Sequence, residues 1–373
     1  MIYLDYAATT PVDKEILKTY QSLLEKHFAN SDSLHDLGTE VRDLLSQSRD
    51  NIAKQLNVKS EEVLFTSGAS EANNTAIKGI AFQKENRSKH FITSEIEHSS
   101  VRSTFLQLQE LGYRVSFAKV DENGVVLLDE LKKLIQADTV LVSIMQVNNE
   151  VGSIQPIMEI KEYVKKHTSA YLHVDMVQAL GKVPVDCSDI DLVSLSAHKI
   201  FGLKGSGILI KKSHVKLLAL ISGGKQEFGH RGGTSNALVN VLFAKTLRLA
   251  LEQQEMSFQY VSELRDYIFD MLETMEKVVL NSTKQGSPFI INFSCLTLSS
   301  EIVLNALNNR GFAVAARSTC STLGEEDAFV LQAMHKSQKV MAGTIRLSLS
   351  KDTKKEELTS FIQSLKEIIE NYG

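Results

Sequence analysis

Two stretches of sequence are the most informative about the fold: Ser194-Leu195-Ser196-Ala197-His198-Lys199 and His173-Val174-Asp175-Met176-Val177-Gln178. Each belongs to a short apolar run that ends in polar groups, a pattern typical of a buried strand that delivers side chains to a site. Asp175 and Lys199 are 24 residues apart, which leaves room for one crossover between neighbouring strands. We therefore predict that Asp175 and Lys199 lie on neighbouring strands of one sheet.

Lys199 and Asp175 supply the two groups that pyridoxal 5'-phosphate requires of a protein. A lysine amine can form a Schiff base with the aldehyde of this cofactor, and a carboxylate can hold its pyridinium nitrogen. The pair therefore predicts an enzyme that acts on an amino acid.

The composition limits the remaining possibilities. The chain has 373 residues, 43% of them hydrophobic and 23% charged, which is enough for a large core and more than one domain. With a net charge of −4 and no basic stripe, direct nucleic-acid binding is not expected. The N-terminal residues lack a signal-peptide pattern, and no apolar run approaches the roughly 18 residues of a membrane span. Neither a disulfide framework nor a metal site is expected from three separated cysteines, so we predict a cytoplasmic protein.

Strand-like and helical patterns alternate from about residue 62 to residue 210. Strands are predicted at 63–65, 91–93, 140–142, 171–174, 192–195 and 205–210. Helices are predicted at 71–83, 101–111, 129–136 and 157–167. This alternation predicts an α/β domain with a mainly parallel sheet flanked by helices.

The pattern changes in the last third of the chain. A long helical pattern that allows for an interruption covers 235–274, and strands of a second, smaller sheet are predicted at 289–293 and 344–348. Further helices are predicted at 300–309 and 354–372. We therefore expect a large cofactor-binding domain over 1–255 and a small α+β domain over 256–373, with residues 1–15 packing against the small domain.

Two glycine-containing segments are candidates for anion binding. Gly68, Ala69 and Ser70 follow a strand and open a helix, where free N–H groups can hold a phosphate; the alternative is an ordinary helix cap. The segment 222–234 is rich in glycine and offers Arg231 and Thr234 to an anion. Its alternative is a flexible surface loop.

Polar residues that follow the predicted strands are candidates for contact with a flat cofactor. His98 could stack on the ring and move protons, or could simply cap a helix. Asn149, or Gln178, could donate to the ring oxygen, although paired asparagines are also common in turns. Arg346, in a predicted strand, could clamp a carboxylate or form a structural ion pair.

Cys320 is the cysteine most suited to chemistry. It lies in a polar segment near Arg317, a cation that favours a thiolate, whereas most unpaired cysteines are buried. The alternative is a passive loop cysteine. Cys295 is expected in the core, and Cys187 is expected to be incidental.

Together these segments resemble the cysteine desulfurases, a family within the fold-type I, class-V aminotransferase-like pyridoxal-phosphate enzymes. The resemblance runs from Tyr3-Leu4-Asp5-Tyr6-Ala7-Ala8-Thr9-Thr10 to beyond Arg346, with the motifs in the family's order. It implies a seven-stranded-type sheet in the large domain. It also implies that Lys199 binds the cofactor and acts on the substrate Cα proton.

The same resemblance assigns the other site residues. It implies that Asp175, Gln178 and His98 contact the cofactor ring. It places the cofactor phosphate against Ala69, Ser70, Ser196 and His198, with Thr234 contributed by the neighbouring subunit of a homodimer. It assigns the substrate to Asn30, Asn149 and Arg346, and makes Cys320 the sulfur-accepting cysteine.

The resemblance therefore predicts an L-cysteine desulfurase that yields L-alanine and a persulfide on Cys320. The sulfur would pass to an acceptor protein for iron–sulfur cluster assembly or tRNA thiolation. Two alternatives stay open at this point. One is a lyase acting on selenocysteine or cystine, which would not need Cys320; the other is a scaffold that keeps the fold without catalysis.

Overall fold

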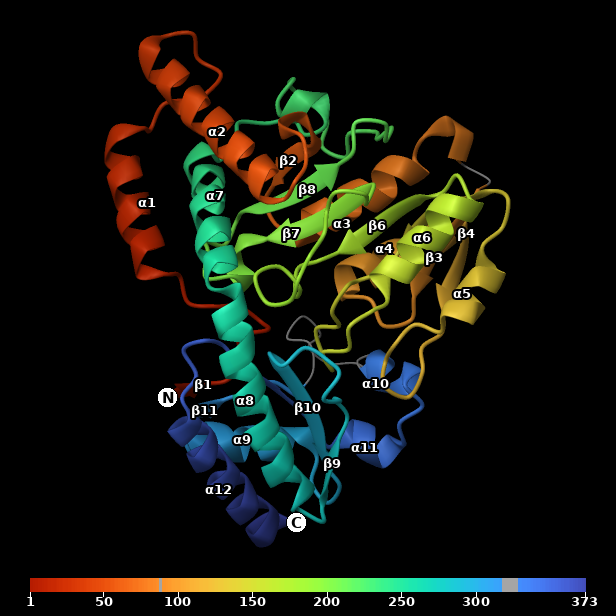
Figure 1. The fold of residues 1–373 in the computed structure, drawn as a ribbon, viewed down its shortest axis with the longest axis vertical. Coiled ribbons are helices and arrows are strands. Elements are labelled where there is room, and N and C mark those ends of the chain that lie inside the picture. Colours follow the sequence, from red (N-terminus) through yellow and green to blue (C-terminus); the bar gives the residue numbers. More distant parts are fainter. Residues whose placement is uncertain (87–88, 317–327) are drawn as a thin grey trace.

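The computed structural model describes residues 1–86, 89–316 and 328–373, which form three sheets with helices packed around them (Figure 1). Cys320 and Arg317 lie outside the described residues. The largest sheet has seven strands in the order β2-β8-β7-β6-β5-β3-β4. Its strands are β2 (Val63–Thr66), β3 (His90–Ser94), β4 (Arg114–Ala118), β5 (Thr139–Ser143), β6 (Tyr171–Asp175), β7 (Leu192–Ser196) and β8 (Gly207–Lys211).

The large sheet is mainly parallel. Strands β4, β3, β5, β6 and β7 pair in parallel, and β8 runs antiparallel between β7 and β2. This arrangement confirms the predicted α/β class, and the antiparallel β8 makes the sheet mixed. The carboxyl ends of the parallel strands share one edge, which is where sheets of this kind bind ligands.

Helices cover both faces of the large sheet because neighbouring strand residues point to opposite sides. On one face, Leu64 and Phe91 pack with α3 (Ala69–Ala81) and α4 (Ser99–Glu110). On the other, Phe65 and Ile92 join a core with residues of α2 (Asp36–Gln55), α5 (Leu128–Leu134), α6 (Ile157–His167) and α7 (Ala237–Glu252). Burial on both faces explains why these strands are continuous apolar runs.

A second core forms around the three-stranded antiparallel sheet β12-β10-β9. Its strands are β9 (Val278–Leu280), β10 (Ile290–Cys295) and β12 (Thr344–Ser348), and its main helices are α8 (Gln254–Glu273), α9 (Ser300–Asn309) and α12 (Lys355–Tyr372). Short helices α10 (Phe329–Ala333) and α11 (Gln338–Ala342) precede β12. Helices α7 and α8 run end to end from the large sheet to this core, and the helical pattern breaks between them at Gln253 (Figure 1).

The N-terminal segment reaches the second core as well. Strand β1 (Ile2–Tyr3) pairs in parallel with β11 (Phe312–Ala313), and Leu4 is buried among the side chains around β10 and β12. Helix α1 (Lys14–Lys26) then returns the chain to α7 of the large sheet. The first fifteen residues therefore connect the two cores.

Several elements were not predicted from the sequence: strand β4, helices α1 and α2, and the short elements β1, β9, β11, α10 and α11. Strand β4 is a half-exposed edge strand, so it lacks the continuous apolar run of its neighbours. Helices α1 and α2 have mainly exposed, polar faces and carry few buried residues for their length.

Among the described residues, none of the helices is both long and apolar enough to cross a membrane.

Candidate active site

A cavity of about 370 Å³ lies where the carboxyl ends of the parallel strands meet the start of α3. The sequence-predicted residues around it come from segments far apart in the chain, and Arg346 comes from the small sheet. Those that line it are Gly68, Ala69, Ser70, His98, Asn149, Asp175, Gln178, Ser196, His198, Lys199 and Arg346.

Asp175 ends β6 with its carboxylate held by two donors. Its Oδ1 accepts from the Val177 N–H at 3.0 Å, and its Oδ2 accepts from Asn73 Nδ2 at 2.8 Å. Asn73 Nδ2 also donates to Ser100 Oγ at 2.9 Å. The carboxylate is therefore fixed in direction, as a partner for a ring nitrogen must be.

Lys199 lies one short turn beyond β7, in the 3₁₀ helix η3 (Ala197–Lys199). Its Nζ donates to the carbonyl oxygens of Ala7 at 2.6 Å and Ala8 at 2.7 Å. The N-terminal segment therefore positions the amine in the cavity that Asp175 lines.

His98 serves two purposes. It is the N-cap residue of α4, and its Nδ1 accepts from the Ser100 N–H at 3.1 Å, as the capping alternative predicts. The ring also lines the cavity. Burial lowers the pKa of His98, so the ring is favoured in its neutral form at pH 7.

The start of α3 forms an anion cradle. Gly68 is its N-cap residue with no side chain over the first turn, and nothing lies within 4 Å of where a Cβ at Gly68 would stand. Ser196 Oγ is buried and has no hydrogen-bond partner among the described residues. His198 also lines the cavity, and burial lowers its pKa to about 4.

Arg346 is buried in β12 and reaches across to the large sheet. Its Nη1 donates to the Asn149 carbonyl oxygen at 2.9 Å, and its Nη2 donates to Asp5 Oδ1 at 2.8 Å. Its Nε has no hydrogen-bond partner among the described residues. A guanidinium fixed in this way, with a donor left over beside a cavity, can bind a carboxylate.

Two predicted residues lie away from this cavity, and a third is outside the described residues. Thr234 lines a neighbouring pocket of about 290 Å³, whose wall shares Ser67 and Gly205 with the main cavity. Asn30 is exposed between α1 and α2, where its Oδ1 accepts from the Asp32 N–H. Cys320 falls in the part of the chain outside the described residues.

Sequence reasoning missed Asn73 and the role of the Ala7 carbonyl. A signal for Asn73 was available: it is a fully buried amide on the α3 face that otherwise carries Ala72, Ala76 and Ile80. A buried polar group needs a hydrogen-bond partner, so an amide on an otherwise apolar helix face indicates a buried polar contact. A backbone carbonyl gives no such signal, because every residue has one.

The arrangement fits pyridoxal phosphate. The unpartnered Ser196 hydroxyl and the open space before Gly68 suit a phosphate at a helix N-terminus. The fixed Asp175 carboxylate suits the ring nitrogen, and the Lys199 amine suits the aldehyde.

Comparison with known proteins agrees with this geometry. The family model described as aminotransferase class-V matches residues 2–361. The chain is 39% identical to the cysteine desulfurase IscS of Dictyoglomus turgidum, covering 99% of this chain and 94% of that protein. It is 38% identical to a NifS/IcsS protein homolog of Lactobacillus delbrueckii subsp. bulgaricus, covering 100% and 98%.

Solved structures give the same result. A NifS-like protein superposes with a TM-score of 0.93 at 34% identity, covering 99% of both chains. A structure described as SspA in complex with cysteine superposes with a TM-score of 0.82 at 31% identity, covering 94% of this chain and 99% of that one. The chain therefore belongs to the class-V aminotransferase family of pyridoxal-phosphate enzymes and, within it, to the cysteine desulfurases.

Proposed function

We propose that this protein is an L-cysteine desulfurase that converts L-cysteine to L-alanine and passes the sulfur to Cys320. The observation that carries the proposal is the single cavity that Lys199, Asp175 and Arg346 share, since these residues would hold the cofactor aldehyde, the cofactor ring nitrogen and the substrate carboxylate. When bound, pyridoxal phosphate supplies an electron sink for the substrate Cα.

Different residues around the cavity would bind different parts of the cofactor. Lys199 would hold its aldehyde, Asp175 its ring nitrogen and Gln178 its ring hydroxyl, with His98 against the ring face. The phosphate would lie against the start of α3, contacting Gly68, Ala69, Ser70, Ser196 and His198, with Thr234 supplied by a second copy of the chain.

The substrate steps use groups of this chain. Arg346 binds the substrate carboxylate, with Asn149 beside it. The family resemblance also assigns Asn30 to the substrate, although Asn30 lies away from this cavity, between α1 and α2. The Lys199 amine moves the proton at Cα.

The sulfur transfer uses Cys320. Its thiolate attacks the substrate sulfur, a sulfur–sulfur bond forms and the carbon–sulfur bond breaks. The electron pair of that bond stays on the carbon skeleton, which takes up protons and leaves as alanine, while Cys320 becomes a persulfide. An acceptor protein for iron–sulfur cluster assembly or tRNA thiolation then receives the sulfur, in a reducing cytoplasm.

The test compares the purified protein with its Cys320→Ala variant. Wild type should show a cofactor absorption band that changes on addition of L-cysteine, and should release alanine; Cys320→Ala should keep the band and lose alanine formation. Cys187→Ala and Cys295→Ala are matched controls, because burial raises the pKa of both thiols to about 12 and leaves them without thiolate at neutral pH.

Other outcomes would change the proposal. Alanine from Cys320→Ala would indicate a lyase that does not need this cysteine. A protein that binds no pyridoxal phosphate would refute the enzyme altogether.

We also propose that the enzyme is a homodimer. Large apolar side chains are exposed on the α1–α2 loop and on the glycine-rich segment: Phe28 is 76% exposed, Leu34 is 93% exposed and Phe228 is 56% exposed. Gln226 Nε2 donates to Asp32 Oδ2 at 2.7 Å, which joins the two segments into one surface. Thr234 lies on the same glycine-rich segment, so a second copy seated there would carry Thr234 toward its neighbour.

The oligomeric state tests the homodimer. Leu34→Glu should shift sedimentation toward the monomer, whereas the same change at Met256, a residue 72% exposed on α8, should leave sedimentation unchanged. A wild-type monomer would refute the homodimer.

A further inference from the structure

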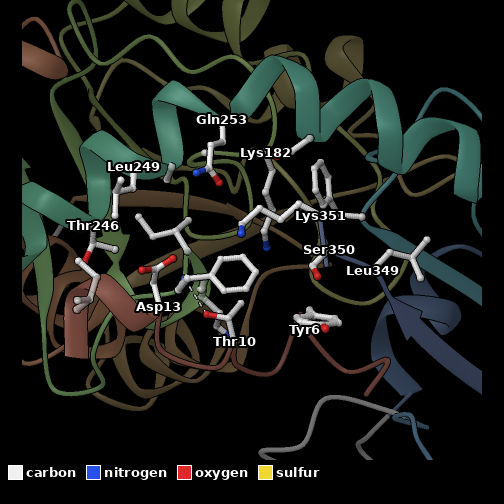
Figure 2. Close-up of a pocket in the computed structure, with 18 residues that line it drawn as sticks. Tyr6, Thr10, Asp13, Lys182, Thr246, Leu249, Gln253, Leu349, Ser350 and Lys351 are labelled. Atoms are coloured by element: carbon white, nitrogen blue, oxygen red, sulfur yellow. Dashed lines mark hydrogen bonds between the residues drawn. The ribbon is translucent and has the colours of Figure 1, made fainter. Parts of the chain in front are cut away.

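A second, smaller cavity lies behind Lys199, away from the main site. Its volume is about 50 Å³, and its walls come from the N-terminal segment, the α7–α8 junction and residues 349–351 (Figure 2). Lys199 borders both cavities, whereas Lys182 borders only the small one. Lys182 is 7% exposed, so its amine is buried directly behind the site.

The Lys182 amine reaches the main cavity through one neighbour. Its Nζ donates to Gln178 Oε1 at 2.7 Å. Gln178 Nε2 donates to the Ala7 carbonyl oxygen at 2.9 Å, the same oxygen that accepts from Lys199. One chain of hydrogen bonds therefore links Lys182, Gln178 and the amine that the proposed reaction uses.

The hydrogen bond from Lys182 determines which end of the Gln178 amide faces the main cavity. An ammonium group has donors only, so it can bond only the oxygen end of an amide. With Oε1 held toward Lys182, the NH₂ end is left for the side of the main cavity, and one of its two hydrogens already goes to Ala7. The second hydrogen can be donated to a ligand in that cavity.

We propose that Lys182 is a positioning residue, which acts through Gln178 by holding its amide so that an N–H is presented to the ring oxygen of bound pyridoxal phosphate. This inference rests on the proposed function. Without Lys182 the amide could turn over and present its oxygen, which would repel an ionised ring oxygen.

The surroundings of Lys182 agree with a role beyond packing. Among the described residues, the charged groups acting on it are the cations Lys199 and Arg346, and burial lowers the pKa of Lys182 to about 7. Asp13 and Lys351 line the same small cavity. The ammonium form can bond only the Gln178 oxygen, whereas the neutral amine can also accept from the amide NH₂, so the orienting effect should weaken as the pH rises above about 7.

The experiment measures cofactor binding and the cofactor spectrum as well as turnover. Lys182→Met should weaken pyridoxal-phosphate binding by about tenfold, the effect of one hydrogen bond, and should shift the absorption band of the bound cofactor. Lys182→Arg should restore both, because the adjacent cavity has room for a guanidinium donor. Lys211→Met is a matched control: Lys211 is also 7% exposed, but its Nζ donates to the Val215 carbonyl oxygen.

A double-mutant cycle distinguishes a positioning role of Lys182 toward Gln178 from a role in packing alone. In a Gln178→Leu background, Lys182→Met should cause no further change in cofactor affinity or band position, because the amide it orients is gone. An equal effect in both backgrounds, or a folded Lys182→Met variant with wild-type affinity and band, would overturn the proposal. If Lys182→Met does not fold, Lys182→Gln is measured in both backgrounds by the same criteria. Alanine release by wild type decides the proposed function separately.

Discussion

The Asp175 carboxylate accepts hydrogen bonds from Asn73 and from the Val177 N–H. Neither donor is part of a recognisable motif, yet together they hold the group that the cofactor ring requires. At the residue scale, the site therefore depends on buried polar side chains that support the ones in contact with ligand.

Replacing Asn73 with alanine should weaken pyridoxal-phosphate binding by roughly tenfold or more, since a hydrogen bond to a charged group contributes about 1.5–3 kcal/mol. Equilibrium titration of the apoprotein with the cofactor checks this. Asn281→Ala is the control, because Asn281 is a buried asparagine of the small core whose amide bonds Asn292 and Ser294. Equal losses of affinity in both variants would argue against a specific role for Asn73.

Glu97 should make folding stability depend on pH. Burial raises the pKa of this carboxyl to about 8, although its Oε1 accepts from Ser94 Oγ and from the Met145 N–H. Above the ordinary carboxyl pKa the folded state holds a proton that the unfolded state has lost, so stability falls as pH rises toward 8.

Glu97→Gln removes this dependence while keeping an acceptor for both donors. Between pH 5 and pH 8, the variant should gain stability over wild type by up to about 1.4 kcal/mol per pH unit. Urea unfolding at several pH values measures the difference. A constant difference across this range would contradict a raised pKa.

At the scale of elements, the cofactor cradle depends on how closely β8 approaches the start of α3. A Cβ added at Gly207 would stand 2.6 Å from Gly68 Cα and 2.5 Å from its carbonyl carbon. Both contacts are with backbone, so no side chain can rotate away. The glycine therefore allows the strand to touch the turn that opens α3.

Gly207→Ala should push the start of α3 away from β8. We expect a loss of about 1–3 kcal/mol in unfolding free energy, the usual cost of overpacking, together with weaker cofactor binding. Ile208→Val, one residue along the same strand, should lower stability by about 1 kcal/mol and leave cofactor affinity unchanged. A Gly207→Ala protein with wild-type affinity would refute this account of the cradle.

At the scale of the whole molecule, the site joins two hydrophobic cores. The domain boundary near residue 255 stays a prediction, and the break between α7 and α8 lies close to it, at Gln253. Arg346 of the small sheet bonds Asp5 of the N-terminal segment and the Asn149 carbonyl of the large unit. Asn292 Nδ2 also donates to the Glu150 carbonyl oxygen, so strands β10 and β12 of the small sheet hold the same loop.

Asp5→Asn should leave the buried Arg346 cation without its countercharge and lower the melting temperature. L-Alanine, the proposed product, should raise the melting temperature of this variant more than that of wild type, because its carboxylate replaces the missing charge. Asp352→Asn is the control, since its ion pair with Lys351 is largely exposed and such pairs contribute little. Equal stabilisation by alanine in all three proteins would contradict the prediction.

The fold class and most of the cavity wall could be predicted from the amino-acid sequence. Strands β2, β3, β5, β6 and β7 are buried on both faces, so each is a continuous apolar run, and the polar residues that follow them must meet at one edge of a parallel sheet. Asp175, Lys199 and His98 were predictable for this reason. Arg346 and Asn149 were also candidates from the residues alone, and the family resemblance assigned both of them to the substrate.

The contacts that hold these residues in place could not be predicted, because they form between distant segments of the chain. The Lys182–Gln178–Ala7 chain, the Asn73 bond to Asp175 and the Asp5–Arg346 pair join segments whose separation in sequence carries no periodic signal. Edge strand β4 was not predicted, because its residues are partly exposed and its sequence therefore lacks a continuous apolar run. Hydrophobic periodicity reports which face of an element is buried, whereas the partner of a buried polar group depends on which distant segment packs against it.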